Sequence, residues 1–283
     1  MAFWGFSFVW VKIVYYYYNP LTTVFLRISS SAVILLAASY FLKINIKPVR
    51  KDYKWLFLLA FFEPFLYFLG ESFGMKYVSS TLASVIISTI PVLSPVAAYF
   101  LAKERISIMN IAGLLISFSG ILIMIIEPDL SFAESPLGVS LMMLAVVAAI
   151  FYTVLIKKLA AGYKPVTILT WQYIFGSALF LPLFLTFDFQ HFISVKPDFR
   201  LIATLLQLII FASLLAFFLF IKVVDKIGIV KTGAFTNLVP VVTAVTAWFF
   251  LPEENITIKT VVGISITIIG IFVAQINRNR NGK

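Results

Sequence analysis

Apolar stretches long enough to cross a membrane recur along the whole chain of 283 residues. Each runs for about 18 to 25 residues, which at ~1.5 Å per residue spans the ~30 Å hydrocarbon core as a helix. Backbone polar groups in lipid must be satisfied within a helix or a closed barrel, and these stretches lack the alternation of barrel strands. The sequence therefore predicts an all-α integral membrane protein with no separate soluble domain.

Composition narrows the possible chemistry. The chain is 61% hydrophobic and 12% charged, whereas soluble proteins carry roughly a quarter charged residues. It has no cysteine, which excludes disulfides, thiolate metal sites and cysteine catalysis. The sequence shows no phosphate-binding loop and no carboxylate or histidine cluster with metal-ligand spacing, so we expect no cofactor and no metal.

The apolar stretches predict ten transmembrane helices joined by short connections. The first begins at Met1 without a basic leader or a cleavage site, so we expect a retained helix and not a signal peptide. It is barely long enough, which indicates a wrongly assigned start or a truncated chain. The expected spans are 1–18, 20–42, 54–74, 79–102, 107–126, 137–156, 166–187, 201–221, 231–251 and 258–276.

Basic residues indicate the orientation of these helices. If the N-terminus is cytoplasmic, inner connections hold 16 of the 22 Lys and Arg, and outer connections hold 4. The positive-inside rule then places both termini in the cytoplasm, including a basic tail over 277–283. The net charge of +10 is explained by topology, so we expect a lipid bilayer and a small solute as partners and no nucleic acid.

The chain contains an internal repeat. Pro91 is followed thirteen residues later by Glu104, and Pro240 is followed thirteen later by Glu253, at an offset of 149. After one extra residue the match continues with Gly120 and Gly270. The repeat divides the chain into halves at 1–126 and 134–276.

Five spans in each half is an odd number, so the second half must enter the membrane in the opposite sense. Inverted repeats are typical of secondary transporters, whose halves exchange inward-open and outward-open shapes around a central site. The alternative is that a duplication merely enlarged a helical bundle.

Four motifs stand out in the spans. They are Trp4-Gly5-Phe6-Ser7-Phe8 with Lys12, Pro20 with Arg27, Pro91 with Glu104, and Pro240 with Glu253. These motifs resemble the EamA family of the drug/metabolite transporter superfamily. The resemblance implies two five-helix repeats and an exporter, or less often an importer, of amino acids or other small metabolites in a bacterial inner membrane. It covers nearly the whole chain but departs from the family at Pro252 and Glu254.

Ionisable residues inside spans are costly and are therefore functional candidates. The sequence places Lys12, Arg27, Glu63 and Glu71 within the first three spans. One alternative is a structural network in which the opposite charges compensate one another. Another is that Lys12 extends its ammonium group toward the membrane surface.

Glu63 is the sharpest candidate because it lies near the middle of its span, directly before Pro64. Proline removes a backbone donor, which loosens the helix and can expose a carbonyl. Our hypothesis is that Glu63 binds a cationic part of the substrate or carries a coupling proton.

Other polar residues and prolines in the spans complete the candidate set. Pro91 and Pro240 are expected to interrupt helices, with small or polar neighbours taking up the freed backbone groups, although static kinks for packing are equally open. Aromatic and amide groups could hold an apolar or zwitterionic solute, or serve as interface anchors. The further candidates are Tyr67, Ser84, Ser88, Trp171, Gln172, Tyr173 and Asn237.

We expect a secondary transporter and no enzyme. The competing functions are a channel, for which no filter segment is legible, and a membrane-embedded lipid or sugar transferase, for which no catalytic cluster is present. Small residues spaced along one face of spans 107–126 and 258–276 indicate close packing within the chain, or a dimer face, so a monomer and a homodimer both stay open.

Overall fold

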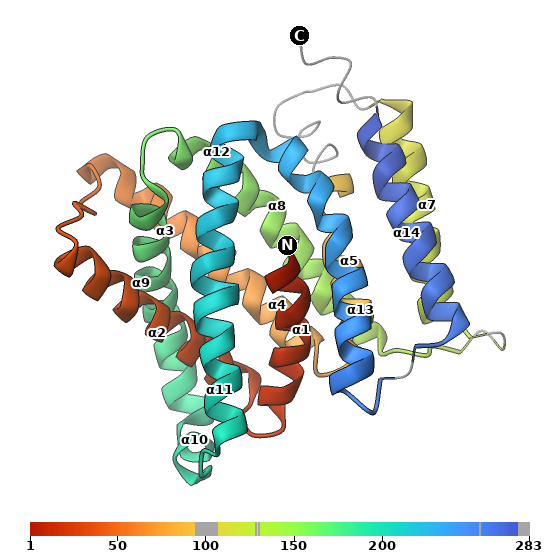
Figure 1. Ribbon diagram of the computed structural model, residues 1–283, viewed down its shortest axis with the longest axis horizontal. Helices are drawn as coiled ribbons and strands as arrows, with labels where there is room; N and C mark the ends of the chain where they lie inside the picture. Colours follow the sequence, from red (N-terminus) through yellow and green to blue (C-terminus); the bar gives the residue numbers. More distant parts are fainter. Residues whose placement is uncertain (94–106, 128, 130, 255, 277–283) are drawn as a thin grey trace.

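The computed structural model describes residues 1–93, 107–127, 129, 131–254 and 256–276. Of residues 227–231, 233, 234, 237 and 276 it describes the backbone alone. Within these ranges the chain is a bundle of helices (Figure 1), and its β-structure is a single isolated bridge between Ile126 and Phe132. The all-α prediction is confirmed for the described residues.

The helices of the first half follow one another through short connections. In chain order they are α1 (Ala2–Tyr15), α2 (Pro20–Phe41), η1 (Arg50–Asp52), α3 (Tyr53–Ala60), η2 (Phe61–Leu66), α4 (Tyr67–Gly74), α5 (Ser80–Ser88) and α7 (Ile108–Ile125).

The second half is built in the same way. In chain order it contains α8 (Pro136–Ala160), α9 (Pro165–Leu183), η3 (Phe184–Asp188), α10 (Phe189–Ser194), α11 (Phe199–Gln207), η4 (Leu208–Leu215), α12 (Ala216–Ala234), η5 (Phe235–Asn237), α13 (Leu238–Phe250) and α14 (Ile258–Ile276). The stretches η2, η3 and η4 have the wider winding of a π-helix and join their neighbours into longer rods.

Among the described residues, 7 helical rods are long and apolar enough to cross a membrane, and three apolar helices are shorter. The shorter ones are α1, the run Ser80–Leu93 and α13. The predicted span 79–102 is described only to residue 93, so its later part lies outside the described residues.

One predicted connection is wrong. We expected a break between 222 and 230, but α12 continues as a helix to Ala234, and α13 begins at Leu238 and not at 231. Charged residues suggested a loop, yet Lys222, Asp225 and Lys226 are exposed on the surface of a helix. Charge alone does not end a helix, and no proline stands in this segment to do so.

Local signals explain where several helices begin. Pro20, Pro136 and Pro165 each stand at the first turn of a helix, where the missing N–H has no partner to lose. The Ser79 and Ser107 hydroxyls cap α5 and α7 by accepting from the backbone N–H three residues on.

Two pairs of helices join the halves in antiparallel fashion. In the first pair, α2 packs against α9 and its continuation η3. The Thr22 N–H donates a hydrogen bond to the Asp188 carboxylate, and the Phe25 ring stacks on Phe184. At α7 and α14, which lie side by side at the right of Figure 1, the backbones approach closely. A Cβ on Gly113 would lie 2.4 Å from the Ala274 nitrogen, and one on Gly120 would lie 2.6 Å from the Gly263 oxygen. The small residues therefore pack within the chain.

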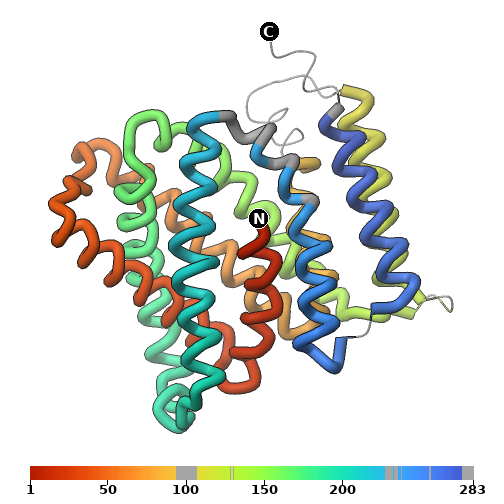
Figure 2. The backbone as a smooth tube through the Cα atoms, viewed as in Figure 1, coloured from red at the N-terminus to blue at the C-terminus, as the bar shows by residue number. Residues whose placement is uncertain are grey.

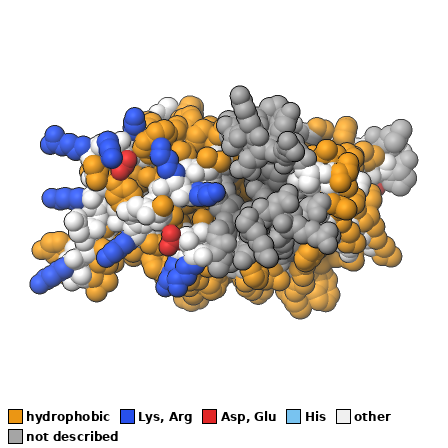
Figure 3. Space-filling view, turned by 90° about the horizontal axis from the view of Figure 1, so that it is seen from above, with side chains coloured by type: hydrophobic (Ala, Val, Ile, Leu, Met, Phe, Trp, Pro, Cys, Tyr) orange, Lys and Arg blue, Asp and Glu red, His pale blue; other side chains and the backbone are white. Residues whose placement is uncertain are grey.

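The two ends of the bundle differ in charge. Lys and Arg gather on the face seen in Figure 3, which we call the basic end. The connections between α7 and α8 and between α13 and α14 lie at the opposite end in Figure 1, which we call the acidic end. They carry Glu127, Asp129, Glu134, Glu253 and Glu254. The exposed basic residues of the basic end include Lys43, Lys47, Arg50, Lys51, Lys54, Lys157, Lys158, Lys164, Lys222 and Lys226.

Helix α1 lies in the middle of the bundle, where it contacts α5, α11 and α13 (Figure 2). Large apolar side chains of α2, α7, α8 and α14 face outward, among them Val33, Leu115, Val147 and Ile269. This apolar exterior is what a bundle surrounded by lipid requires.

Candidate functional site

A cavity lies between the two halves of the chain. Residues from α1, α2, η2, α4, α5, α8, α12, η5 and α13 line it. Its volume is about 100 Å³. Its polar and aromatic lining residues are Trp4, Ser7, Phe8, Arg27, Glu63, Tyr67, Phe68, Glu71, Ser88, Tyr152, Thr153, Phe217, Phe220 and Thr236.

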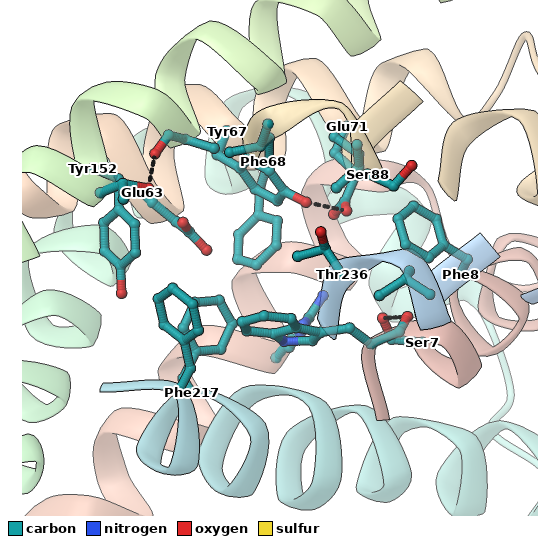
Figure 4. A pocket seen from close by; sticks show the side chains of 18 residues that line it. Ser7, Phe8, Glu63, Tyr67, Phe68, Glu71, Ser88, Tyr152, Phe217 and Thr236 are labelled. Carbon is teal, nitrogen blue, oxygen red and sulfur yellow. Dashed lines mark hydrogen bonds between the residues drawn. The ribbon is translucent and has the colours of Figure 1, made fainter. Parts of the chain in front are cut away.

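Glu63 reaches this cavity because its helix is interrupted there. The residue has extended backbone angles, φ −145° and ψ 120°, between helical neighbours, and it precedes Pro64. The α9 backbone passes so close that a Cβ on Gly176 would lie 2.3 Å from Pro64 Cγ. Figure 4 shows the Glu63 carboxylate pointing into the cavity, in the same part as Tyr152 and Phe217. Glu63 is buried, with 5% of its surface exposed, and it accepts no hydrogen bond from the described residues.

Glu71 occupies another part of the cavity. The Tyr67 hydroxyl donates to Glu71 Oε1 over 2.8 Å, so this carboxylate is partly satisfied within the protein. Ser88 lies in the same part in Figure 4, and its hydroxyl donates to the Val85 carbonyl. Glu63 and Glu71 therefore face one space from different directions.

Arg27 brings a buried positive charge to the site. Its Nε donates to Ser213 Oγ over 2.5 Å, and its guanidinium carbon lies 4.6 Å from the centre of the Phe68 ring. No carboxylate within the described ranges lies close enough to form an ion pair with Arg27. The one ion pair among the described residues joins Lys259 and Glu127, at the acidic end. The expected compensating network is thus not formed by direct ion pairs.

Two residues of helix α9 lie next to the cavity but do not line it. The Tyr173 hydroxyl donates to the Ser213 carbonyl over 2.6 Å, next to the hydroxyl that holds Arg27. Gln172 is fully buried, and its side chain lies beside the Tyr152 hydroxyl. Gln172 and Tyr173 are thus near the cavity without lining it.

Other candidates from the sequence lie away from the cavity. Lys12 is half-buried near Glu134, Glu253 and Glu254 at the acidic end, and not beside Arg27. The predicted group of four charges is therefore split by the fold. Ser84 is buried and donates to the Thr81 carbonyl.

Trp171 donates to the Ile46 carbonyl near the basic end. The helical run that begins at Ser80 is interrupted at Thr89, just before Pro91. Pro240 stands in the first turn of α13, where proline is well tolerated. The Asn237 side chain lies outside the described residues.

Sequence reasoning missed most of the apolar lining. Trp4, Phe8, Tyr152, Phe217 and Phe220 shape the cavity, but membrane helices contain so many aromatic residues that none of these stood out. The Trp4-Gly5 pair was the one available signal, because it carried the family resemblance.

Hydrogen bonds join the two halves at the acidic end. Glu254 accepts from the Ser80 N–H over 2.6 Å and from the Ser80 hydroxyl over 2.7 Å, at the start of α5. The Tyr16 hydroxyl donates to Glu253, and this hydrogen bond lowers the pKa of Glu253. We call the contact between Glu254 and Ser80 the acidic-end latch.

Comparison with known proteins identifies the family. The model of the EamA-like transporter family matches residues 1–126 and 136–275. The chain belongs to the EamA-like transporter family. EamA membership confirms the resemblance seen in the motifs, and it makes the chain a multi-pass membrane protein. It supports a transporter role and argues against an enzyme.

Individual relatives of this EamA chain are similar over most of its length. An uncharacterized transporter of Archaeoglobus fulgidus is 29% identical over 96% of this chain and 95% of its own. The uncharacterized transporter YetK of Bacillus subtilis is 27% identical over 82% of this chain and 70% of its own. A solved crystal structure of a protein matches 99% of this chain and 98% of its own with a TM-score of 0.69. Its 17% identity limits that likeness to the fold.

Proposed function

We propose that this protein is a secondary transporter, gradient-driven or facilitative, that exports amino acids or related small metabolites by alternating access. One observation carries the proposal. Side chains from both halves enclose a single cavity, and three of them are ionisable groups without an ion-pair partner among the described residues. Such groups are costly in a membrane unless they meet a solute or an ion. We assign Glu63 the binding of a cationic group or of a coupling proton.

The halves 1–126 and 134–276 are proposed to be inverted repeats. Exchange of the halves relates the contact of the rod α3–η2–α4 with α8 to that of the rod α11–η4–α12 with α1. It also relates the contact of α1 with α13 to that of α8 with α5. It maps the pairs of α2 with α9, of α5 with α13, and of α7 with α14 onto themselves. The antiparallel packing of α2 on α9 and of α7 on α14 supports this relation, because inverted equivalents must run in opposite directions.

Both termini are proposed to lie in the cytoplasm of a bacterial cell, with the protein in the inner membrane. The collection of Lys and Arg at the basic end supports this orientation. The chain has no cysteine, so Asp129→Cys and Lys47→Cys each introduce one unique thiol. In intact cells an impermeant maleimide should label the first and spare the second. Labelling of the second alone would reverse the topology.

The competing functions make different predictions. A channel would pass its solute without saturation, and a lipid or sugar transferase would release a fixed product. The described residues contain no group of three or more His, Asp or Glu that could hold a metal, and the family argues for transport. A carrier is therefore the function that this cavity supports best.

Counterflow in proteoliposomes tests the proposal. Vesicles loaded with one unlabelled solute should accumulate the same labelled solute from outside, with amino acids, amines and purines as the first panel. Glu63→Gln should slow exchange by about tenfold or more, because a buried charge contact is lost. Asp129→Asn, the same change at an exposed residue, should leave the rate unchanged. Absence of exchange for every solute, from a folded protein, would overturn the proposal.

A further inference from the structure

The described residues that line the cavity include two carboxyl groups and one guanidinium. Glu63 and Glu71 supply the carboxyl groups, and Arg27 supplies the guanidinium. Within the part of the chain that the structure describes, no lysine, histidine or second arginine lines the cavity. With all three groups ionised, the described lining carries an excess of one negative charge. A net charge enclosed by apolar helices is costly, so the cavity is most stable when one positive charge enters it.

We propose that the preferred substrate is an organic amine that carries a single positive charge and an aromatic or cyclic apolar group. This inference rests on the proposed transport function and narrows it to one class of metabolite. A zwitterionic amino acid adds no net charge and leaves the excess uncompensated. An amine cation of the same shape neutralises the excess.

Glu63 is the group that receives the ammonium. Glu71 already accepts the Tyr67 hydroxyl, whereas Glu63 accepts nothing from the described residues and points into the cavity (Figure 4). A carboxylate without a donor is the stronger acceptor for an ammonium group, which carries three donors. The contact would replace the hydrogen bonds that Glu63 lacks inside the protein.

The aromatic wall receives the rest of the molecule. The Trp4 ring packs edge-on against Phe217 at 5.0 Å and lies 5.2 Å from Phe220, so the three rings form a continuous surface. Flat apolar groups gain from such contacts, and aromatic faces also attract cations. An amine with an aromatic ring can therefore reach Glu63 while its ring packs on this wall.

Arg27 is the residue that could favour amino acids over amines, but its contacts in the protein count against that role. Its guanidinium could bind the carboxylate of an amino acid. However, Nε is engaged by Ser213, and the plane of the group lies near the Phe68 ring. Its charge therefore offsets one of the two carboxylates in place, and we assign it no contact with the substrate.

Matched pairs of solutes test the inference with the full chain in proteoliposomes. Tyramine and tyrosine differ by one carboxylate, as do phenethylamine and phenylalanine. Counterflow at neutral pH, corrected for protein-free vesicles, should favour each amine over its amino acid by about tenfold or more. Equal or faster exchange of the amino acids would overturn the inference.

Variants of Glu63 separate the possible outcomes. Glu63→Gln should abolish the preference for the amine, and Glu63→Asp should retain part of it. Asp129→Asn, an exposed residue outside the cavity lining, is the control and should leave the preference unchanged. A Glu63→Gln protein that still prefers the amine as strongly as the unaltered protein would show that Glu63 does not receive the ammonium group, and the inference would be wrong. Exchange of neither member of a pair, while another metabolite is exchanged, would reject the amine class and leave the proposed transport function intact.

Discussion

Arg27 is a buried charge whose cost is offset by specific contacts. Its side chain is 3% exposed in a lipid-embedded bundle, where an unsatisfied charge is destabilising. Its planar guanidinium group donates a hydrogen bond from Nε to Ser213 while the face of the group lies near the Phe68 ring. Lysine has a single ammonium group and cannot make both contacts at once. The requirement at this position is therefore for arginine and not simply for positive charge.

We predict that Arg27→Lys destabilises the protein by about 1–3 kcal/mol, because a hydrogen bond to a charged group is lost. Thermal unfolding in detergent should show a lower melting temperature. Lys12→Arg serves as the control and should have little effect, because Lys12 is half-buried near the acidic end. An unchanged melting temperature for Arg27→Lys would show that the Ser213 contact is unimportant.

At the scale of elements, α7 and α14 depend on the absence of side chains at their crossing. A Cβ on Gly270 would lie 2.4 Å from the Ser117 nitrogen and 2.5 Å from its hydroxyl. Both are closer than van der Waals contact permits, and a backbone nitrogen cannot move away as a flexible side chain can. The two helices would have to separate along their whole length.

Gly270→Ala should therefore destabilise the protein by about 1–3 kcal/mol, the usual cost of an overpacked contact. Gly162→Ala is the matched control, because the nearest atom to its added Cβ is 4.0 Å away. Thermal unfolding of the two variants should lower the melting temperature for the first alone. Equal melting temperatures would mean that the helices tolerate separation.

For the whole molecule, the acidic-end latch couples the halves on one side of the cavity. Glu254 belongs to the connection between α13 and α14, and it accepts the backbone N–H groups of Ser80 and Thr81 at the start of α5. A carboxylate at a helix N-terminus is stabilising. Any state that opens the cavity toward this end must break these hydrogen bonds. The latch thus favours closure of the acidic end.

Removal of the latch should open this end more often. With Ser88→Cys as the reporter inside the cavity, Glu254→Ala should raise the rate of labelling by an impermeant thiol reagent from the acidic end. Loss of hydrogen bonds to a charged acceptor, at about 1.5–3 kcal/mol, corresponds to roughly a tenfold change or more. Glu127→Ala, at the same end but paired with Lys259, is the control. An unaltered labelling rate for Glu254→Ala would contradict the assigned role.

The class of the protein and the helix interruption at Glu63 could be predicted from the amino-acid sequence. Both are local consequences of physics, since lipid forces apolar segments into helices and proline removes a donor wherever it stands. Spans near Pro20, Pro136 and Pro165 were placed well for the same reason. The wrong connection at 222–230 arose because charge was read as a loop where α12 continues.

Which residues share the cavity could not be predicted from the sequence, because it depends on how the helices pack. Lys12 and Arg27 looked equivalent in the sequence, yet packing places Lys12 at the acidic end and Arg27 beside Ser213, 186 positions further along the chain. Trp4 and Phe217 carry no local signal, because aromatic residues make up 17% of the chain and are common throughout its helices. Their role depends on which faces meet, and that is set by helix packing between the halves and not by any neighbouring stretch of sequence.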